Sequence, residues 1–326
     1  MIKLMADSTC DLSDEILEKY DISMAPLTIT INGQDYKDRI DISPDEFYTR
    51  LAAMDTLPTT AMPSPKMYLD LIDEAIEKGY DQILCINMSS GTSGSYQSAM
   101  LARSMFYEDH PDSAIKIHIV DSKSMSHGSG YLLVKSALLR EQGATFQELI
   151  DFNETFKTNI KHLLSVEDLD NLIKSGRLTN VSAMIGKILK VRPIMSMRSG
   201  KGAIVGKVRG GKKVFSYYID EFNKRNDSEL TDFVIIGYSS DIRKAEAMKA
   251  KLLEETDFKG KVYIMQMGVS VGTHVGLGGL SLYFIESGNR HDGLIYNEMA
   301  TLLEMKDKMS KMLKDYKEKT MNSIKK

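Results

Sequence analysis

The sequence contains no tryptophan and only two cysteines among its 326 residues. Two cysteines in so long a chain do not make the disulfide framework of a small secreted domain. Neither lies in a Cys/His cluster with zinc-ligand spacing, so we expect no metal. A reducing cytoplasm is the natural compartment for such a chain. Cys85 lies in an apolar run, residues 83–86, and is predicted to be a small core residue.

Long apolar runs are absent as well. No stretch of about 18 or more apolar residues occurs, so we expect no membrane-spanning helix. The first seven residues lack the apolar segment of a signal peptide and favour a short strand. Apolar residues make up 42% and charged residues 27% of the chain, which is typical of globular proteins, and the length predicts about two domains.

Excess positive charge is confined to the C-terminus. Residues 301–326 carry eight lysines against four acidic residues, while the rest carries 34 basic and 41 acidic residues. An acidic body does not suit a nucleic-acid-binding protein, whose affinity comes from neutralising phosphates, so we expect no nucleic acid as partner. The basic segment has two readings, a solvated helix face or a contact with an acidic surface.

Strands and helices alternate in the first half of the chain. Asn32-Gly33 predicts a type I′ hairpin, and Ser43-Pro44-Asp45-Glu46 has the pattern of a capping box. The predicted strands are 2–5, 28–31, 34–36, 82–87 and 115–120, and the predicted helices are 43–54, 64–78, 94–106 and 131–141. Buried strands that alternate with helices indicate an α/β fold with a mostly parallel sheet covered on both faces.

The pattern changes after a second capping box at Thr145, whose helix ends near residue 160. We therefore predict an N-terminal α/β domain over residues 1–160 and a second α/β domain over residues 161–290. The second domain is predicted to contain helices 167–174, 181–189 and 242–255, hairpin-like strands over 193–218, and strands 233–237 and 261–267. Residues 291–326 are predicted to be a helical extension, with one amphipathic helix over 294–322.

Polar, glycine-rich turns follow several predicted parallel strands, which is where open α/β sheets bind ligands. The most pronounced is residues 89–95, Ser-Ser-Gly-Thr-Ser-Gly-Ser, called here the serine loop. It leads directly into a helix, so its hydroxyls and free backbone N–H groups suit an anion. Helix capping alone accounts for such residues equally well. Asp7 and Asp121 lie at the ends of two of the predicted strands.

Common nucleotide and hydrolase motifs are missing. The sequence has no P-loop, no G-x-G-x-x-G in the first turn, and no G-x-S-x-G elbow, because the serine loop ends in Ser95. A triad of Ser93 with a histidine and an aspartate stays an alternative. His127 and His274 lie in glycine-rich segments and are its candidate bases, with Asp7 or Asp121 as the acid.

Two further residues allow both a binding and a structural reading. His274 lies in Gly272-Thr273-His274-Val275-Gly276-Leu277-Gly278-Gly279, where glycines permit close backbone approach to a ligand or merely unusual turns. Arg177 follows Gly176 at a predicted helix end, where a surface arginine is also common.

Seven segments in the same order resemble the DegV family between Asp7 and about Phe284. They are Asp7-Ser8-Thr9-Cys10-Asp11-Leu12, Thr60-Ala61-Met62-Pro63-Ser64, residues 89–99, Val120-Asp121-Ser122, Gly176-Arg177-Leu178, Arg192-Pro193-Ile194 and Gly272-Thr273-His274-Val275-Gly276. The resemblance implies two α/β domains with a long-chain fatty acid between them. It is strongest to the fatty-acid-binding subunits of bacterial fatty acid kinase, in which a separate ATP-binding subunit phosphorylates the bound carboxylate for phospholipid synthesis.

The resemblance also implies roles for individual residues. Ser93, with Gly94 beside it, matches the serine that binds the carboxylate, and Thr60 would add a second hydroxyl. Arg177 and His274 match head-group residues linked to phosphotransfer. No cofactor is implied apart from the bound fatty acid, and a transient contact with the membrane or an acyltransferase stays open.

The sequence departs from the family pattern in three places. Ala61 and Met62 replace the usual Ser and Gln, Ser175 replaces a Gly, and Leu277 replaces a common Pro. The segment after residue 294 lies beyond the usual family length. A lipid carrier or sensor without a kinase partner, and a serine hydrolase acting through Ser93, remain the alternative functions.

Overall fold

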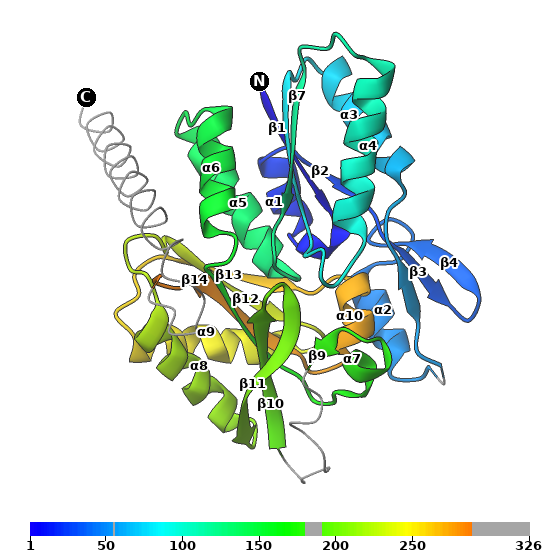
Figure 1. Ribbon diagram of the computed structural model, residues 1–326. Coiled ribbons are helices and arrows are strands. Elements are labelled where there is room, and N and C mark those ends of the chain that lie inside the picture. The colour runs from blue at the N-terminus through cyan, green and yellow to red at the C-terminus, as the bar shows by residue number, and fades with distance from the viewer. Residues whose placement is uncertain (55, 180–190, 289–326) are drawn as a thin grey trace.

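The computed structural model describes residues 1–54, 56–179 and 191–288 (Figure 1). The predicted helices 181–189 and 294–322 lie outside these residues, as does the predicted extension over 291–326. Both predicted α/β regions therefore fall largely within the described part, and the extension stays a prediction.

The first sheet has four parallel strands in the order β2-β1-β6-β7. β1 and β6 are central, and each is buried at every position except its first. This is the expected pattern for parallel strands that are covered on both faces. The strands are β1 (Ile2–Asp7), β2 (Ile22–Ala25), β6 (Gln82–Asn87) and β7 (Lys116–Asp121).

Helices cover both faces of this sheet, as predicted. On one face, α3 (Pro65–Glu77) and α4 (Ser95–Asp109) pack on Ile83. On the other face, α5 (His127–Glu141) and α6 (Phe146–Phe156) pack on Leu84 (Figure 1). Because neighbouring residues of a strand point to opposite faces, the apolar run of β6 supplies both cores.

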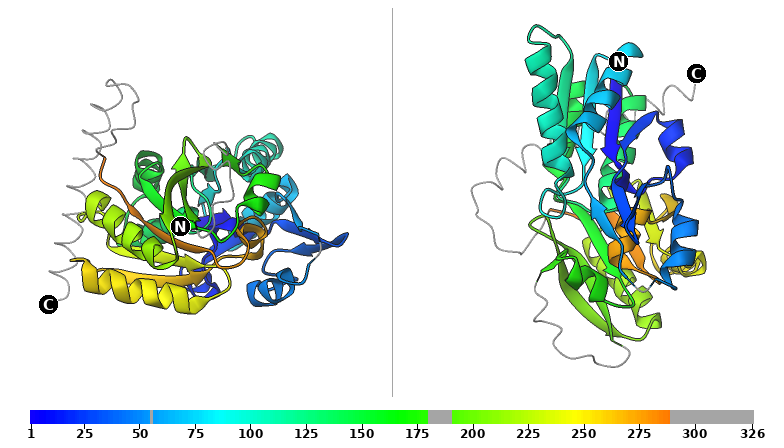
Figure 2. Two further views of the ribbon diagram at one scale, coloured as in Figure 1. Left: turned by 90° about the horizontal axis from the view of Figure 1, so that it is seen from below. Right: turned by 90° about the vertical axis from the view of Figure 1, so that its right-hand side faces the viewer.

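The second sheet is mixed, with seven strands in the order β13-β12-β14-β8-β10-β11-β9. Its strands are β8 (Ile160–Ser165), β9 (Leu178–Thr179), β10 (Val191–Arg198), β11 (Lys201–Arg209), β12 (Phe233–Tyr238), β13 (Lys261–Gln266) and β14 (Leu280–Ile285). α8 (Lys212–Arg225) and α9 (Ile242–Glu255) contribute to a core on one face. Residues of α5, α6 and both sheets share another core, so α5 lies between the sheets (Figure 1). In the right-hand view of Figure 2, most of the yellow-green second half of the chain lies below the blue and cyan strands of the first sheet. The domain boundary at residue 160 stays a prediction.

A small antiparallel sheet, β4-β3-β5, and helix α2 (Pro44–Leu51) form a lobe beside the first sheet. Its strands are β3 (Thr28–Ile31), β4 (Gln34–Lys37) and β5 (Thr59–Ala61). Asn32 and Gly33 both have positive φ, 50° and 80°, which confirms the type I′ turn. The Ser43 hydroxyl accepts the Glu46 N–H at the start of α2, as a cap should.

Several elements differ from the prediction. The predicted strands over 193–218 end at Arg209, and α8 follows, because the Gly210-Gly211 pair breaks the strand before an amphipathic stretch. α5 begins at His127 rather than residue 131. Its first turn contains Gly128 and Gly130, which read as a loop in the sequence but here allow close packing.

Short elements escaped prediction as well. The 3-10 turn η1 (Ser8–Cys10) and helices α1 (Asp14–Lys19) and α10 (Val269–Val275) are examples, while α7 (Asp170–Lys174) lies within a predicted helix. Both cysteines are buried and free. Among the described residues, no helix has the length and apolar character needed to cross a bilayer.

Candidate functional site

A cavity lies where the carboxyl ends of the parallel strands meet the second sheet and α10. Its lining comes from both halves of the chain, including the serine loop, β5, β8, β10, β14 and α10. The space not filled by protein atoms is about 750 Å³, including open solvent at the mouth of the cavity. A cavity therefore lies at the strand ends, where the sequence predicts a ligand site.

Most of the cavity wall is apolar. Four methionines, Met88, Met125, Met195 and Met267, line it together with leucine and valine side chains from β8, α7 and α10. Methionine is unbranched and has three rotatable bonds, so its side chain adapts to partners of varied shape. Such a wall fits a long flexible apolar ligand.

Ser93 presents its hydroxyl at this cavity, next to the first turn of α4. Its Oγ accepts the Ser95 N–H at 3.2 Å and lies 2.9 Å from the Ser95 Oγ. α4 itself has Gly94 as N-cap residue, which offers no side-chain cap. Ser93 therefore places a hydroxyl group where the helix start favours negative charge.

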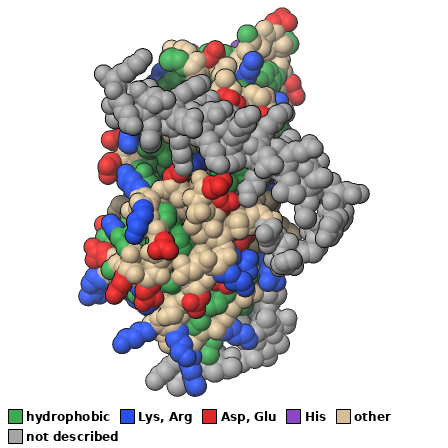
Figure 3. Space-filling view, turned by 90° about the vertical axis from the view of Figure 1, so that its left-hand side faces the viewer, with side chains coloured by type: hydrophobic (Ala, Val, Ile, Leu, Met, Phe, Trp, Pro, Cys, Tyr) green, Lys and Arg blue, Asp and Glu red, His purple; other side chains and the backbone are tan. Residues whose placement is uncertain are grey.

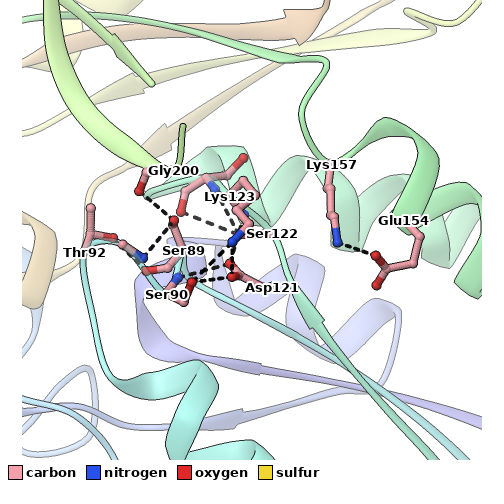
Figure 4. A network of polar contacts seen from close by, with 11 residues as sticks. Ser89, Ser90, Thr92, Asp121, Ser122, Lys123, Glu154, Lys157 and Gly200 are labelled. Atoms are coloured by element: carbon pink, nitrogen blue, oxygen red, sulfur yellow. Dashed lines mark hydrogen bonds and ion pairs between the residues drawn. The ribbon is translucent and has the colours of Figure 1, made fainter. Parts of the chain in front are cut away.

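Polar contacts outside the cavity hold the serine loop in place (Figure 4). Ser89 Oγ donates to the Gly200 carbonyl at 2.7 Å, which ties the loop to the turn between β10 and β11. Asp121 accepts the Ser90 N–H at 3.0 Å and also bonds the Ser90 hydroxyl and Lys123. Burial opposes ionisation of Asp121, but these hydrogen bonds outweigh it and lower the pKa of its carboxyl.

Gly94 lies close to the side chain of Met62, the residue that follows β5. A Cβ at this position would lie 2.2 Å from Met62 Sδ. Met62 is one of the departures from the family pattern, and its side chain is half exposed. The absence of a side chain at Gly94 thus lets the start of α4 approach the segment that carries Thr60.

Thr60 and His274 are brought together although they are 214 residues apart. Thr60 Oγ1 lies 3.0 Å from His274 Nε2, and the buried Nδ1 of His274 has no partner among the described residues. Burial, with the positive charge of Arg177 nearby, lowers the pKa of His274 to about 4. The imidazole is therefore neutral near pH 7, with one ring nitrogen free to bond a ligand.

Arg177 also lines the cavity, after the αL residue Gly176 at the end of α7. Its Nη1 donates to the Ser175 carbonyl. The effect of its charge on His274 places a cation close to the Thr60–His274 pair. Ser93, Thr60, Arg177 and His274, all singled out from the sequence, thus line one cavity, and Gly94 lies beside it.

The residues of the alternative triad are not hydrogen-bonded to one another in the described part of the chain. Ser93 bonds Ser95, although His274 lines the same cavity. Asp7 accepts hydrogen bonds from Thr9 and the Met88 N–H, while Asp121 bonds Ser90 and Lys123. The hydrolase alternative therefore has no hydrogen-bonded Ser–His pair to support it among these residues.

Sequence reasoning missed five polar residues of the cavity wall, which are Ser126, His162, Ser196, Ser270 and Tyr283. His162 and Tyr283 lie within strands whose sequences give no sign of a site. Ser126 precedes α5 with a φ of 53°, a strained conformation for a residue with a side chain. The glycines after Ser126 were the one available signal for tight packing at this point.

Comparisons with known proteins agree on one family. The model of the DegV family, described as one of uncharacterised proteins, matches residues 1–287. A DegV domain-containing protein of Clostridium acetobutylicum is 34% identical over 288 residues, covering 87% of this chain and 98% of the relative.

Two solved structures are similar in fold and sequence. A stearic-acid-binding protein of Eubacterium ventriosum has a TM-score of 0.80 at 28% identity, over 88% of this chain and 98% of its own. A fatty-acid-binding DegV family protein of Thermus thermophilus has a TM-score of 0.79 at 25% identity, over 88% and 99%. With the family model matched over residues 1–287 and a relative matched almost end to end, this chain belongs to the DegV family.

Proposed function

We propose that this protein binds a long-chain fatty acid in the cavity and presents its carboxylate to a separate ATP-dependent kinase subunit. The observation that carries the binding part is the pairing of a methionine-rich apolar wall with the buried, unpaired Nδ1 of His274. The two similar structures from Eubacterium ventriosum and Thermus thermophilus, described as fatty-acid-binding proteins, support the choice of ligand.

The acyl chain would supply most of the affinity. About fourteen methylenes at ~0.8 kcal/mol each give roughly 11 kcal/mol of gross transfer free energy. Ordering the chain and losing its translational freedom reduce this value considerably. The head group then contributes mainly orientation, because it determines which end of the ligand faces the polar side chains.

The carboxylate would be held by neutral donors with one cation nearby. The Ser93 hydroxyl and an N–H at Gly94 are proposed donors, and the Thr60–His274 pair supplies one more. The neutral ring carries a single proton, so either His274 Nδ1–H donates while Thr60 donates to Nε2, or the Thr60 hydroxyl donates while it accepts from Nε2–H. A buried carboxylate without partners costs several kcal/mol, and these donors offset that cost. Arg177 would stabilise charge that develops when a phosphoryl group arrives.

In the kinase reaction, a carboxylate oxygen attacks the γ-phosphorus of ATP on the partner subunit, and ADP leaves with the broken bond's electron pair. This chain would supply neither ATP nor a metal. Its proposed contribution is to hold the carboxylate in one orientation within reach of the partner. We assign the protein to the cytoplasm, because two unpaired cysteines suit a reducing compartment.

The first experiment is native mass spectrometry of the purified protein, before and after incubation with palmitate or oleate. We expect a mass increase of one fatty acid and recovery of that acid on organic extraction. If no acyl chain is found under either condition, the binding proposal is wrong.

In the second experiment, ATP and the ATP-binding subunit of a bacterial fatty acid kinase are added to the protein. Any acyl phosphate that forms is trapped with hydroxylamine as the hydroxamate. Acyl phosphate that depends on both proteins supports presentation to a kinase. Binding without any acyl phosphate across several chain lengths would favour a carrier or sensor. Ester hydrolysis by the chain alone would instead favour the hydrolase alternative.

A further inference from the structure

Two buried aspartate side chains hold the start of helix α10 from distant segments of the chain. Asp11 Oδ1 accepts the Gly268 N–H at 2.8 Å. The two Asp38 oxygens accept the N–H groups of Val269 at 3.2 Å and Ser270 at 3.4 Å. The first three backbone donors of the helix are therefore satisfied by side chains more than 200 residues away.

This arrangement differs from ordinary helix capping. The N-cap residue of α10 is Gly268, which has no side chain, so the helix cannot cap itself. Asp11 and Asp38 are 1% and 0% exposed, and burying a carboxyl group is costly unless its oxygens are hydrogen-bonded. Here the oxygens of both carboxyl groups accept hydrogen bonds from the backbone of α10 and from nearby serine hydroxyls.

A third residue of the N-terminal region fixes the same helix. The Tyr48 hydroxyl donates to the Met267 carbonyl at 3.1 Å, just before α10. A Cβ atom at Gly272 would lie only 2.4 Å from the oxygen of the same hydroxyl. Contacts with the N-terminal region therefore fix α10 both at its start and along the side that faces α2.

The other side of α10 forms part of the cavity wall. Val271, His274 and Val275 line the cavity at helical spacing, and His274 meets Thr60. His274 is six residues beyond Gly268, which is about 9 Å along the axis at a rise of ~1.5 Å per residue. A shift or rotation of the helix start would therefore move the imidazole directly.

Asp11 also connects α10 with the opposite wall of the cavity. It accepts the hydroxyl of Ser126 at 2.5 Å, and Ser126 lines the cavity with its backbone at φ 53°. A strained residue of this kind keeps its conformation only where its surroundings over-determine it. Asp38 likewise accepts the hydroxyl of Ser8 at 2.8 Å.

We propose that Asp11 and Asp38 are positioning residues of the head-group site, which act by fixing α10 and, through it, the imidazole of His274 against Thr60. This inference deepens the proposed fatty-acid-binding function and concerns residues that need not touch the ligand. Without the two aspartate side chains, α10 would lose its anchorage to the region that carries Thr60.

The test compares Asp38→Ala and Asp11→Ala with Asn153→Ala as a matched control. Asn153 is fully buried and hydrogen-bonded to Ser136 and Leu149, but within α5 and α6 and away from α10. The readouts are the pH titration of the His274 ring by NMR, the fatty-acid Kd and thermal stability. The titration needs no ligand, so it reports on positioning even if the proposed function fails.

We expect both alanine variants to move the His274 midpoint upward from about 4 and to weaken fatty-acid binding about tenfold or more. The control should lose thermal stability without either change. Asp38→Asn keeps one acceptor oxygen and should give an intermediate effect. If an alanine variant does not fold, its asparagine counterpart is measured instead. An unchanged His274 titration and Kd in the folded variants, with stability lost as in the control, would overturn the proposal.

Discussion

The proposed function assigns the Ser93 hydroxyl to the carboxylate of the ligand. It lies in the cavity wall and already orders the start of α4 through the Ser95 N–H. A hydrogen bond to a charged group is worth about 1.5–3 kcal/mol, and each 1.4 kcal/mol is about tenfold in affinity. The proposed function therefore makes a quantitative prediction for its removal.

Ser93→Ala should raise the Kd for palmitate about tenfold or more while the protein stays folded. Isothermal titration calorimetry measures this, with palmityl alcohol as a second ligand. The alcohol lacks the carboxylate, so its affinity should change less. Equal losses for both ligands would place the Ser93 hydroxyl away from the carboxylate.

Asp11 predicts a pH dependence of stability. Burial raises the pKa of its carboxyl from 3.8 to about 8. Between about pH 4 and pH 8 the folded protein therefore keeps a proton that the unfolded chain has released. Stability contributed by this group falls as the pH rises through that window. Asp11→Asn should show a shallower decline in urea unfolding experiments over the same window, and identical slopes would contradict this account.

At the scale of elements, α5 shows how one helix links the two sheets to the cavity. Its first turn places Gly128 against the ring of His162 on β8. A Cβ on Gly128 would lie 2.1 Å from His162 Nε2 and within 3 Å of two further ring atoms. His162 is buried and lines the cavity, so the ring has little room to move away.

Gly128→Ala should therefore destabilise the protein by about 1–3 kcal/mol, as overpacking does. Gly211→Ala, where nothing lies within 4 Å of the added Cβ, is the control and should be close to neutral. Adding His162→Ala to Gly128→Ala should recover part of the loss. A strictly additive double mutant in chemical denaturation would contradict the proposed clash.

At the scale of the whole molecule, basic and acidic side chains both occur over the described part of the face seen in Figure 3. The interior is more informative, because the cavity is walled by segments of both sheets and by α10. A ligand that fills it contacts both halves of the chain at once. Binding and the stability of the whole molecule are therefore linked.

A fatty acid at 100 times its Kd should add about 2.7 kcal/mol to the free energy of unfolding. In a thermal scan this should appear as one transition shifted upward by several degrees. Hydrogen exchange should slow in both the serine loop and α10. A shift limited to one of two separate transitions would show that only one half of the chain holds the ligand.

Much of the architecture and several candidate site residues could be predicted from the sequence alone. Local signals suffice where a pattern is complete within a few residues: the apolar run of β6, the Asn32-Gly33 turn and the cap at Ser43. The serine loop, Thr60, Arg177 and His274 were found because they form segments that resemble one family in order. The structural signals are local, whereas the site residues were found from the order of seven segments along the chain.

Only the tertiary structure decided which of these residues meet. Thr60 and His274 are 214 residues apart, and Asp11 and Asp38 reach α10 across more than 200 residues. α10 has only seven residues, of which four are β-branched, so its sequence does not predict a helix. Its caps come from the distant side chains of Asp11 and Asp38. The first turn of α5 was misread for the same reason: its glycines serve contacts with His162 and Cys10 that no local pattern contains.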